Sequence, residues 1–448
     1  MALLHLGDYT RKRDPDATLP TLRLDPSRLD TVELGIRPID MEQVMSFTRR
    51  QFIGSLAAAA ATSQVRAAES TPSPLNDPLG VRGDFPVVTD TVYLDSPYIT
   101  PSPHQAVLAA QEFVAAKGRV PISLGGMLGE SNAVREKFAE LIGAQTAEIG
   151  LLYATSDGEN IVAQALDMGA GDNVVIDDLH YETTYNLYRK LEQERGVELR
   201  IVRAKGGAAS AEAFAELVDA KTKLVSVSWV SHQNGYHHDL KPLAELAHAH
   251  GAYLYADAIQ GVGMLELDVR RCGIDFLTAG TYKWLLGGYG VAPFYVRSAL
   301  LDTVEIDRSG SLHIARHRED FHFDLHRDGR KYGYATLAFG AVFQLRAALD
   351  YLLKTGVPNI ERHTVALAHS IRSGLLDQGF AVTTPADNRS AIVTFAHGRD
   401  VAQVRKDLEN ANIKVSLKEG GEKIRIGTAL FNNTDEVKTF LELTSRWT

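Results

Sequence analysis

The sequence contains one cysteine, Cys272, among 448 residues. A single thiol excludes a disulfide within the chain, and it excludes a zinc site built on paired cysteines. Cys272 stands where an expected helix end leads into a strand, and buried cysteines usually behave as small hydrophobic side chains. We therefore interpret it as a packed structural thiol.

Long runs of one kind of residue are also missing. No block of about five or six basic residues occurs and the net charge is −9, which argues against a nucleic-acid partner. The weakly apolar run near the amino terminus is too short and too rich in alanine to remain as a membrane anchor. One charged stretch gathers histidines without the cysteines or the tight spacing of a zinc site, so we interpret it as a loop that lines the substrate entrance and expect no metal there: His313, His317, His322 and His326.

The front of the chain lacks a regular pattern. Residues 1–44 mix charge, proline and leucine, and we interpret them as a poorly ordered extension or as a start placed too early, with Met45 the true beginning. Residues 45–68 resemble a twin-arginine export signal, because paired arginines precede a short apolar run. An ordinary basic amphipathic helix is the alternative. With residues 69–92 as a linker, we expect a periplasmic or exported protein, and a cytoplasmic one if the signal is false.

Alternating helical and strand patterns begin near Tyr93. Strands rich in valine, isoleucine and leucine, without polar alternation, predict burial on both faces and hence a mainly parallel sheet between helices. The length suggests about two or three domains. We expect an α/β domain over residues 93–325 and a smaller C-terminal α+β domain over 326–448. The strands expected in the larger domain cover residues 148–153, 173–176, 199–202, 224–229, 252–256, 276–279 and 292–296.

Four loops of the expected larger domain carry polar residues at the carboxyl ends of strands, where ligands bind in such sheets. The first places Thr155 and Ser156 at a helix start, which suits a phosphate because of the free N–H groups and the helix dipole. A plain helix N-cap is the alternative. In the second loop, Tyr181 offers a ring that could lie flat on a cofactor. In the third, His232 is placed to move protons near a substrate, or only to cap its loop.

The fourth loop carries the strongest chemical signal. A strand ends at Asp257, and Lys283 follows the next strand in a glycine-flanked turn. A lysine amine forms a Schiff base with the aldehyde of pyridoxal phosphate, and a carboxylate keeps the pyridine nitrogen protonated, so that the ring stabilises a neighbouring carbanion. Asp257 and Lys283 therefore predict a pyridoxal phosphate enzyme. An isolated surface lysine beside a tryptophan is the alternative.

The stretch from Tyr153 to Val296 resembles the class V aminotransferases, a fold-type I branch of pyridoxal phosphate enzymes that includes cysteine desulfurases and isopenicillin N epimerase. The likeness extends from about Tyr93 to the chain end. It implies a seven-stranded, mainly parallel sheet and a homodimer with the active site at its interface. It also implies an amino acid or peptide amine as the substrate.

The same resemblance implies a role for individual residues. Lys283 would hold the cofactor, Asp257 would pair with the ring nitrogen, and Gln260 would contact the phenolic oxygen. Tyr181 lies where members carry a ring that stacks on the cofactor. The implied phosphate contacts are Thr155, Ser156, Tyr282 and, from the second subunit, Thr336.

One departure and one further residue stand near the carboxyl end. Members usually carry Gly-Thr where this chain has Ala335 and Thr336. Arg425 matches the arginine that binds the substrate carboxylate, a task for which the guanidinium fork offers two parallel hydrogen bonds. A strand-end arginine in a salt bridge is the alternative.

The sequence leaves the reaction open. Cysteine desulfurases use a nucleophilic cysteine on a mobile loop, and residues 414–421 contain none, so persulfide transfer is not expected. The remaining chemistry begins with removal of the substrate's α proton by Lys283. We expect an aminotransferase or an epimerase-like enzyme, with C–S or other β-elimination as the alternative. A cofactor-free binding protein or a secreted scaffold would not need Asp257, Gln260 and Lys283 together.

Overall fold

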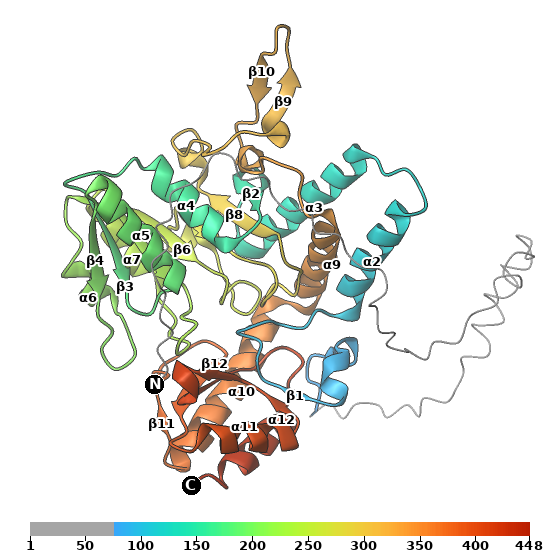
Figure 1. Ribbon diagram of the computed structural model, residues 1–448, viewed down its shortest axis with the longest axis vertical. Coiled ribbons are helices and arrows are strands. Elements are labelled where there is room, and N and C mark those ends of the chain that lie inside the picture. Colours follow the sequence, from blue (N-terminus) through green and yellow to red (C-terminus); the bar gives the residue numbers. More distant parts are fainter. Residues whose placement is uncertain (1–75) are drawn as a thin grey trace, which may run out of the picture. The chain divides into compact units, whose positions relative to one another are not determined.

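A seven-stranded sheet organises the larger part of the chain in the computed structural model, which describes residues 76–448 (Figure 1). Only β8 runs antiparallel to its neighbours in this sheet. The α/β fold with a mainly parallel sheet, predicted from the sequence, is therefore confirmed. In sheet order the strands are β2 (Ile149–Leu152), β8 (Ala292–Val296), β7 (Phe276–Thr278), β6 (Tyr253–Asp257), β5 (Thr222–Ser228), β3 (Asn173–Asp177) and β4 (Glu198–Val202).

Both faces of this sheet are buried. Along β6, Leu254 and Ala256 belong to one hydrophobic cluster and Tyr255 belongs to another, as the alternation of side chains along a strand requires. Helices that follow the strands cover the two faces. These helices are α4 (Thr155–Ala165), α5 (Glu182–Arg195), α6 (Ala211–Ala215), α7 (Leu240–Ala249) and α8 (Val269–Cys272).

Three longer helices pack together beside the sheet (Figure 1). They are α2 (His104–Lys117), α3 (Leu124–Ile142) and α9 (Phe339–Thr355). The helix α9 follows the predicted boundary at residue 325 in the chain, yet it packs on α2 and α3, which precede the boundary. The division into domains at this residue stays a prediction, because residues 76–448 group as one compact unit.

A smaller antiparallel sheet has its own hydrophobic cluster. Its strands, in order, are β11 (Ala381–Val382), β12 (Ile392–Ala396), β15 (Lys423–Gly427) and β14 (Ser416–Lys418). The helices α10 (Val357–Asp377), α11 (Val401–Asn410) and α12 (Thr434–Thr444) accompany it. The strand β1 (Val92–Tyr93) pairs with β13 (Ile413–Lys414), so the first described strand lies with the carboxyl-terminal part.

One stretch differs from its sequence interpretation, and two expected segments fall outside the part of the chain that the structure describes. The histidine-rich stretch, interpreted as a loop, forms the hairpin of β9 (Ile314–His317) and β10 (Phe323–Leu325). The extension and the twin-arginine-type signal lie outside the described residues. Within residues 76–448, no helix is long and apolar enough to cross a membrane.

Candidate active site

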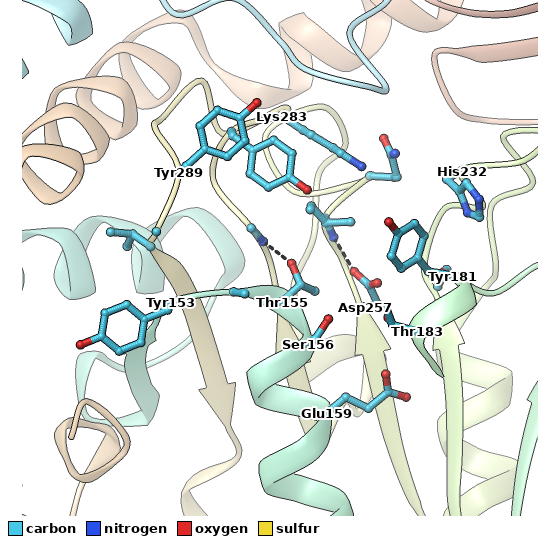
Figure 2. A pocket seen from close by; sticks show the side chains of 18 residues that line it. Tyr153, Thr155, Ser156, Glu159, Tyr181, Thr183, His232, Asp257, Lys283 and Tyr289 are labelled. Carbon is cyan, nitrogen blue, oxygen red and sulfur yellow. Dashed lines mark hydrogen bonds between the residues drawn. The ribbon is translucent and has the colours of Figure 1, made fainter. Parts of the chain in front are cut away.

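A cavity of about 380 Å³ opens at the carboxyl edge of the seven-stranded sheet (Figure 2). The loops after β2, β3, β5, β6 and β7 all contribute to its lining, as expected where parallel strands end together. Eight residues that the sequence singled out line this one cavity. They are Thr155, Ser156, Tyr181, His232, Asp257, Gln260, Tyr282 and Lys283.

Asp257 is the last residue of β6 and lies deep in the cavity. Its Oδ1 accepts a hydrogen bond from the backbone N–H of Ile259, at 3.0 Å. Burial raises the pKa of Asp257, and the neighbouring His180 and the Ile259 bond oppose that change. A cationic group beside Asp257 would stabilise its negative charge, because a buried charge without an ionic partner is costly.

Lys283 projects into the same cavity from the turn after β7 and is 8% exposed. Burial lowers its pKa to about 8, with Asp257 opposing the shift and Arg425 adding to it. The turn closes at Leu286, which donates its N–H to the carbonyl oxygen of Lys283 at 2.8 Å and adopts a φ of +58°. Such a φ is rare for leucine, so the backbone is strained beside the lysine.

The phosphate cradle predicted at the start of α4 is tied to the lysine turn. Thr155 Oγ1 accepts a hydrogen bond from the N–H of Gly280, at 3.0 Å (Figure 2). A Cβ on Gly280 would lie 2.8 Å from Thr155 Oγ1, so the close approach requires glycine. Thr155 and Ser156 occupy the first turn of α4, whose N–H groups have no acceptor within the helix. This end of the helix is suited to an anion.

Aromatic side chains form two walls of the cavity. Tyr181 precedes α5 and meets the ring of His232 edge to face, with 5.1 Å between the ring centroids. Burial lowers the pKa of His232 to about 3, helped by the charge of Lys418, so this imidazole is neutral. Tyr282 stacks on Tyr289 with centroids 4.6 Å apart. The sequence did not identify Tyr289, because nothing in its local pattern distinguishes a wall residue from a surface tyrosine.

Gln260 is held on both sides of its amide. Its Nε2 donates to the carbonyl oxygen of Pro97 at 2.8 Å, and its Oε1 accepts from Trp284 Nε1 at 2.9 Å. One N–H of the amide remains for a ligand. The tryptophan beside Lys283 therefore has a defined task, which is to orient Gln260.

Two predicted site residues lie outside this cavity. Arg425, on β15, is 3% exposed and donates from Nη1 to the carbonyl oxygen of His232 at 2.9 Å. Its Nη2 donates to Ser416 Oγ at 3.0 Å, and it lines a neighbouring cavity. The backbone carbonyl oxygen of Thr336 accepts a hydrogen bond from the hydroxyl of Tyr153 at 2.8 Å. The roles that the resemblance implies for these two residues stay predictions.

A buried hydrogen-bond chain below the cavity was missed by the sequence interpretation. Glu159 Oε1 accepts from Ser226 Oγ at 2.6 Å, and Ser226 Oγ lies 3.2 Å from His180 Nε2. His180 Nδ1 accepts the N–H of Tyr181 at 2.8 Å, so Nε2 is the ring nitrogen that donates toward Ser226 Oγ. The chain therefore links a buried carboxylate to the residue that forms a cavity wall. The sequence offered one signal of this buried chain. Ser226 and Ser228 are polar residues two positions apart in an apolar strand, so they share one face of it.

Among residues 76–448, neither a metal site nor a thiol accompanies the cavity. In the part of the chain that the structure describes, no three His, Cys, Asp or Glu side chains group as metal ligands. Cys272 ends α8, directly before β7, and so lies at the amino edge of the sheet, opposite the cavity. It is half-buried, packs against the main hydrophobic cluster, and burial raises its pKa. The packed thiol inferred from the sequence agrees with this position.

The chain belongs to the class V aminotransferase family, whose pattern matches residues 92–435. A probable cysteine desulfurase of Methanothermobacter thermautotrophicus is 29% identical over 381 residues, which cover 80% of this chain and 95% of that protein. The cysteine desulfurase of Thermococcus onnurineus superposes with a TM-score of 0.75 at 24% identity, over 83% of this chain and 98% of that one.

A third similar protein is the cystine C–S lyase C-DES, with a TM-score of 0.75 at 18% identity, over 81% of this chain and 99% of that one. One structure of C-DES has glycine covalently linked to its pyridoxal phosphate. At these identities the likeness establishes the fold, which is that of fold-type I enzymes.

The residues around the cavity fit pyridoxal phosphate. The buried carboxyl group of Asp257 can pair with a protonated pyridine nitrogen, and the start of α4 offers N–H groups to a phosphate. Lys283, with its pKa lowered to about 8, offers an amine of which a substantial share is neutral near pH 8. Family and donor set together identify pyridoxal phosphate as the cofactor of this site.

Proposed function

We propose that the chain is a pyridoxal phosphate-dependent lyase that breaks the C–S bond of a sulfur-containing amino acid. The sequence interpretation placed an aminotransferase or an epimerase-like enzyme first and a β-eliminating lyase second. The similar proteins favour the second interpretation, because they are described as cysteine desulfurases and a cystine C–S lyase. The observation that carries the proposal is Lys283, buried in a cavity with a pKa lowered to about 8.

The site residues would divide the work of elimination. The cofactor, when bound, supplies an electron-withdrawing ring that stabilises negative charge at the substrate's Cα. Asp257 holds the positive charge of the ring nitrogen in place. Lys283 would take the α proton as the general base, because its pKa, lowered to about 8, leaves a larger share of the amine neutral at physiological pH than an ordinary lysine has. Electron density at Cα then expels the sulfur substituent from Cβ with the bonding electron pair, and a proton from solvent neutralises it.

The sulfur would be released into solution rather than transferred to a thiol of the enzyme. Cys272 is on the opposite edge of the sheet, and residues 414–421 contain no cysteine. Elimination from cysteine itself would therefore yield sulfide, pyruvate and ammonia. A desulfurase that keeps sulfur as an enzyme persulfide would need a thiol beside the cavity.

The test is to incubate the purified protein with L-cysteine and with L-cystine and to measure sulfide or persulfide together with pyruvate. We expect both products in equal amounts, abolished in Lys283→Ala, and a borohydride-stable label on Lys283. Transfer of the amino group to an added 2-oxo acid without sulfur release would contradict the lyase proposal. It would support the aminotransferase interpretation instead. Inversion of configuration at the substrate's α carbon without elimination would support the epimerase interpretation.

We also propose a homodimer. Exposed apolar side chains gather on α2 and on the segment that joins it to α3, in contrast to the polar surface expected of a monomer. A groove of about 510 Å³ between these helices and α9 is lined by Phe113, Ile122, Met127 and Phe343. A second copy covering this face would bury the groove.

Export by the twin-arginine route remains a proposal from residues outside the described part. It rests on Arg49 and Arg50 before a short apolar run. Replacing both with lysine should keep a fused reporter in the cytoplasm, whereas the unchanged segment should deliver it to the periplasm. Equal delivery by both would contradict the proposal.

A further inference from the structure

A second cavity of about 380 Å³ adjoins the first on the side of the smaller sheet. Arg425 lines this second cavity, His232 lines the first, and the hydrogen bond between them forms part of the shared wall. We call it the distal cavity. Its charged lining has four basic and two acidic side chains, namely Arg405, Lys414, Lys418, Arg425, Asp95 and Glu409.

Lys418 stands on the same face of β14 as Ser416, because alternate residues of a strand point the same way. Ser416 pairs with Arg425 across the β14–β15 ladder, and its Oγ accepts from Arg425 Nη2 at 3.0 Å. Lys418 therefore lies one step along the face that presents Arg425. Both side chains line the distal cavity.

The positive charge of these two residues is incompletely balanced. Lys418 is half-buried, and no acidic oxygen among residues 76–448 forms a salt bridge within 4.0 Å of its ammonium nitrogen. Arg425 is 3% exposed, and its Nε has no hydrogen-bond partner in that same part of the chain. Arg425 lies 4.0 Å from Asp95, and the exposed Lys414 lies 3.9 Å from the same carboxylate. One carboxylate therefore serves two cations while Lys418 has none, so the site keeps excess positive charge for an anion.

We propose that Lys418 binds an anionic group at the far end of the substrate's side chain, while Arg425 binds the α-carboxylate. This inference rests on the proposed function, since it names the kind of sulfur amino acid that the lyase takes. The α-carboxylate offsets one excess positive charge of the distal cavity, and an acidic S-substituent offsets the other. The substrate class is therefore cysteine derivatives whose sulfur substituent ends in a carboxylate or a sulfonate.

The charge of Lys418 also acts on the reacting end of the site. It helps to lower the pKa of His232 and of Lys283, which both line the cofactor cavity. Burial and the nearby Arg425 in turn lower the pKa of Lys418 itself. A bound anion would relieve this mutual repulsion, so we expect acidic side chains to be selected over neutral ones of equal size.

The experiment compares two amino acids of equal length that contain no C–S bond. L-2-aminoadipate ends in a carboxylate, and L-homoglutamine is its neutral amide. Each is titrated into the holoenzyme, and the change in cofactor absorbance gives Kd. We expect aminoadipate to bind at least about tenfold more tightly, as a charge-assisted hydrogen bond allows. In Lys418→Met the preference should vanish, whereas Lys418→Arg should retain it.

Lys414→Met is the matched control, because Lys414 lines the same cavity but is exposed and paired. It should leave the preference unchanged. Equal Kd values for the two ligands in the unaltered enzyme would overturn the proposal, as would a preference that survives in Lys418→Met. Since neither ligand can undergo C–S cleavage, a failed lyase assay would refute the proposed function without affecting this measurement. Turnover of S-carboxymethyl-L-cysteine over its carbamoylmethyl analogue would support both.

Discussion

Arg425 donates a hydrogen bond of 2.9 Å to the backbone carbonyl oxygen of His232, across 193 residues of sequence. The bond joins the smaller sheet to the loop after β5, so that the cofactor cavity and the distal cavity share one wall. Nη1 is thus used by the protein, and Nη2 donates to Ser416 Oγ. Nε, which has no hydrogen-bond partner among residues 76–448, and the second N–H of each terminal nitrogen are left for a substrate.

Replacing Arg425 with lysine should raise KM for an amino acid substrate by about tenfold or more, because an ammonium lacks the planar fork that donates two parallel hydrogen bonds to a carboxylate. Steady-state kinetics would measure the effect, and kcat should change less than KM. Arg405→Lys is the control, since Arg405 is an exposed side chain of the same distal cavity. A KM unchanged in Arg425→Lys would show that the carboxylate binds elsewhere.

The lowered pKa of Lys283 predicts how the cofactor-free protein recombines with pyridoxal phosphate. Only the neutral amine attacks the aldehyde, and its fraction grows as pH rises through the pKa. With a pKa of about 8, the rate should rise up to pH 8 to 9 and then level off. An ordinary lysine would keep accelerating towards pH 10.5. Stopped-flow absorbance at several pH values would distinguish these curves, and continued acceleration beyond pH 10 would contradict the burial argument.

The buried Glu159 should matter for stability. Its two carboxylate oxygens accept hydrogen bonds from Ser226, Tyr188 and Thr184, and no salt bridge to a basic side chain of residues 76–448 accompanies them. Glu159→Gln would place an amide donor against hydroxyl donors, and we expect a loss of about 1–3 kcal/mol in the free energy of unfolding. Urea denaturation of the holoenzyme measures it. The exposed Glu194→Gln should change stability by less than about 0.5 kcal/mol. Equal effects would remove the special role of the buried chain.

Cys272 should be dispensable for sulfur release. The thiol lies at the edge of the sheet opposite Lys283, and its pKa is raised by burial, which makes it a poor nucleophile. Cys272→Ala should therefore retain sulfide production from cysteine at nearly the original rate. If the variant accumulates no sulfide while the unaltered protein does, sulfur passes through an enzyme persulfide, and the elimination route is wrong.

The sequence predicted the fold and most of the cavity because both depend on local signals. Each β strand of the large sheet is a short apolar run, and Asp257 and Lys283 sit at strand ends that must meet at one edge. Glu159 and His180 escaped notice, because their importance comes from contacts between α4, β5 and the loop after β3. No local pattern encodes such contacts.

The same limit explains Arg425. Its motif was visible, but its attachment to His232 and its place in the distal cavity depend on how β15 meets the larger sheet. The hairpin of β9 and β10 escaped for a different reason. Its strands are short and rich in charge and histidine, so they lack the apolar alternation that marks a strand.

The exposed apolar surface near α2 leads to the last prediction. Val114 on α2 is 63% exposed, and Val120 and Leu124 nearby are each 54% exposed. In a homodimer these side chains would lie in the interface, where a stable contact buries more than about 1,000 Å². Val114→Asp would place a charge in that contact without touching the hydrophobic core, so we expect dissociation to monomers while the helical circular dichroism signal is kept.

Sedimentation velocity over a range of concentrations would measure the change. Leu376→Asp provides the control, because Leu376 is 44% exposed on α10, away from α2 and α3. It should leave the dimer intact. A protein that is monomeric before any substitution, or a dimer indifferent to Val114→Asp, would show that this apolar face serves another partner. The family resemblance implies that Thr336 of the second subunit contacts the cofactor phosphate. Dissociation should therefore also weaken cofactor retention on dialysis. A monomer that keeps its cofactor would show that one chain contains a complete site.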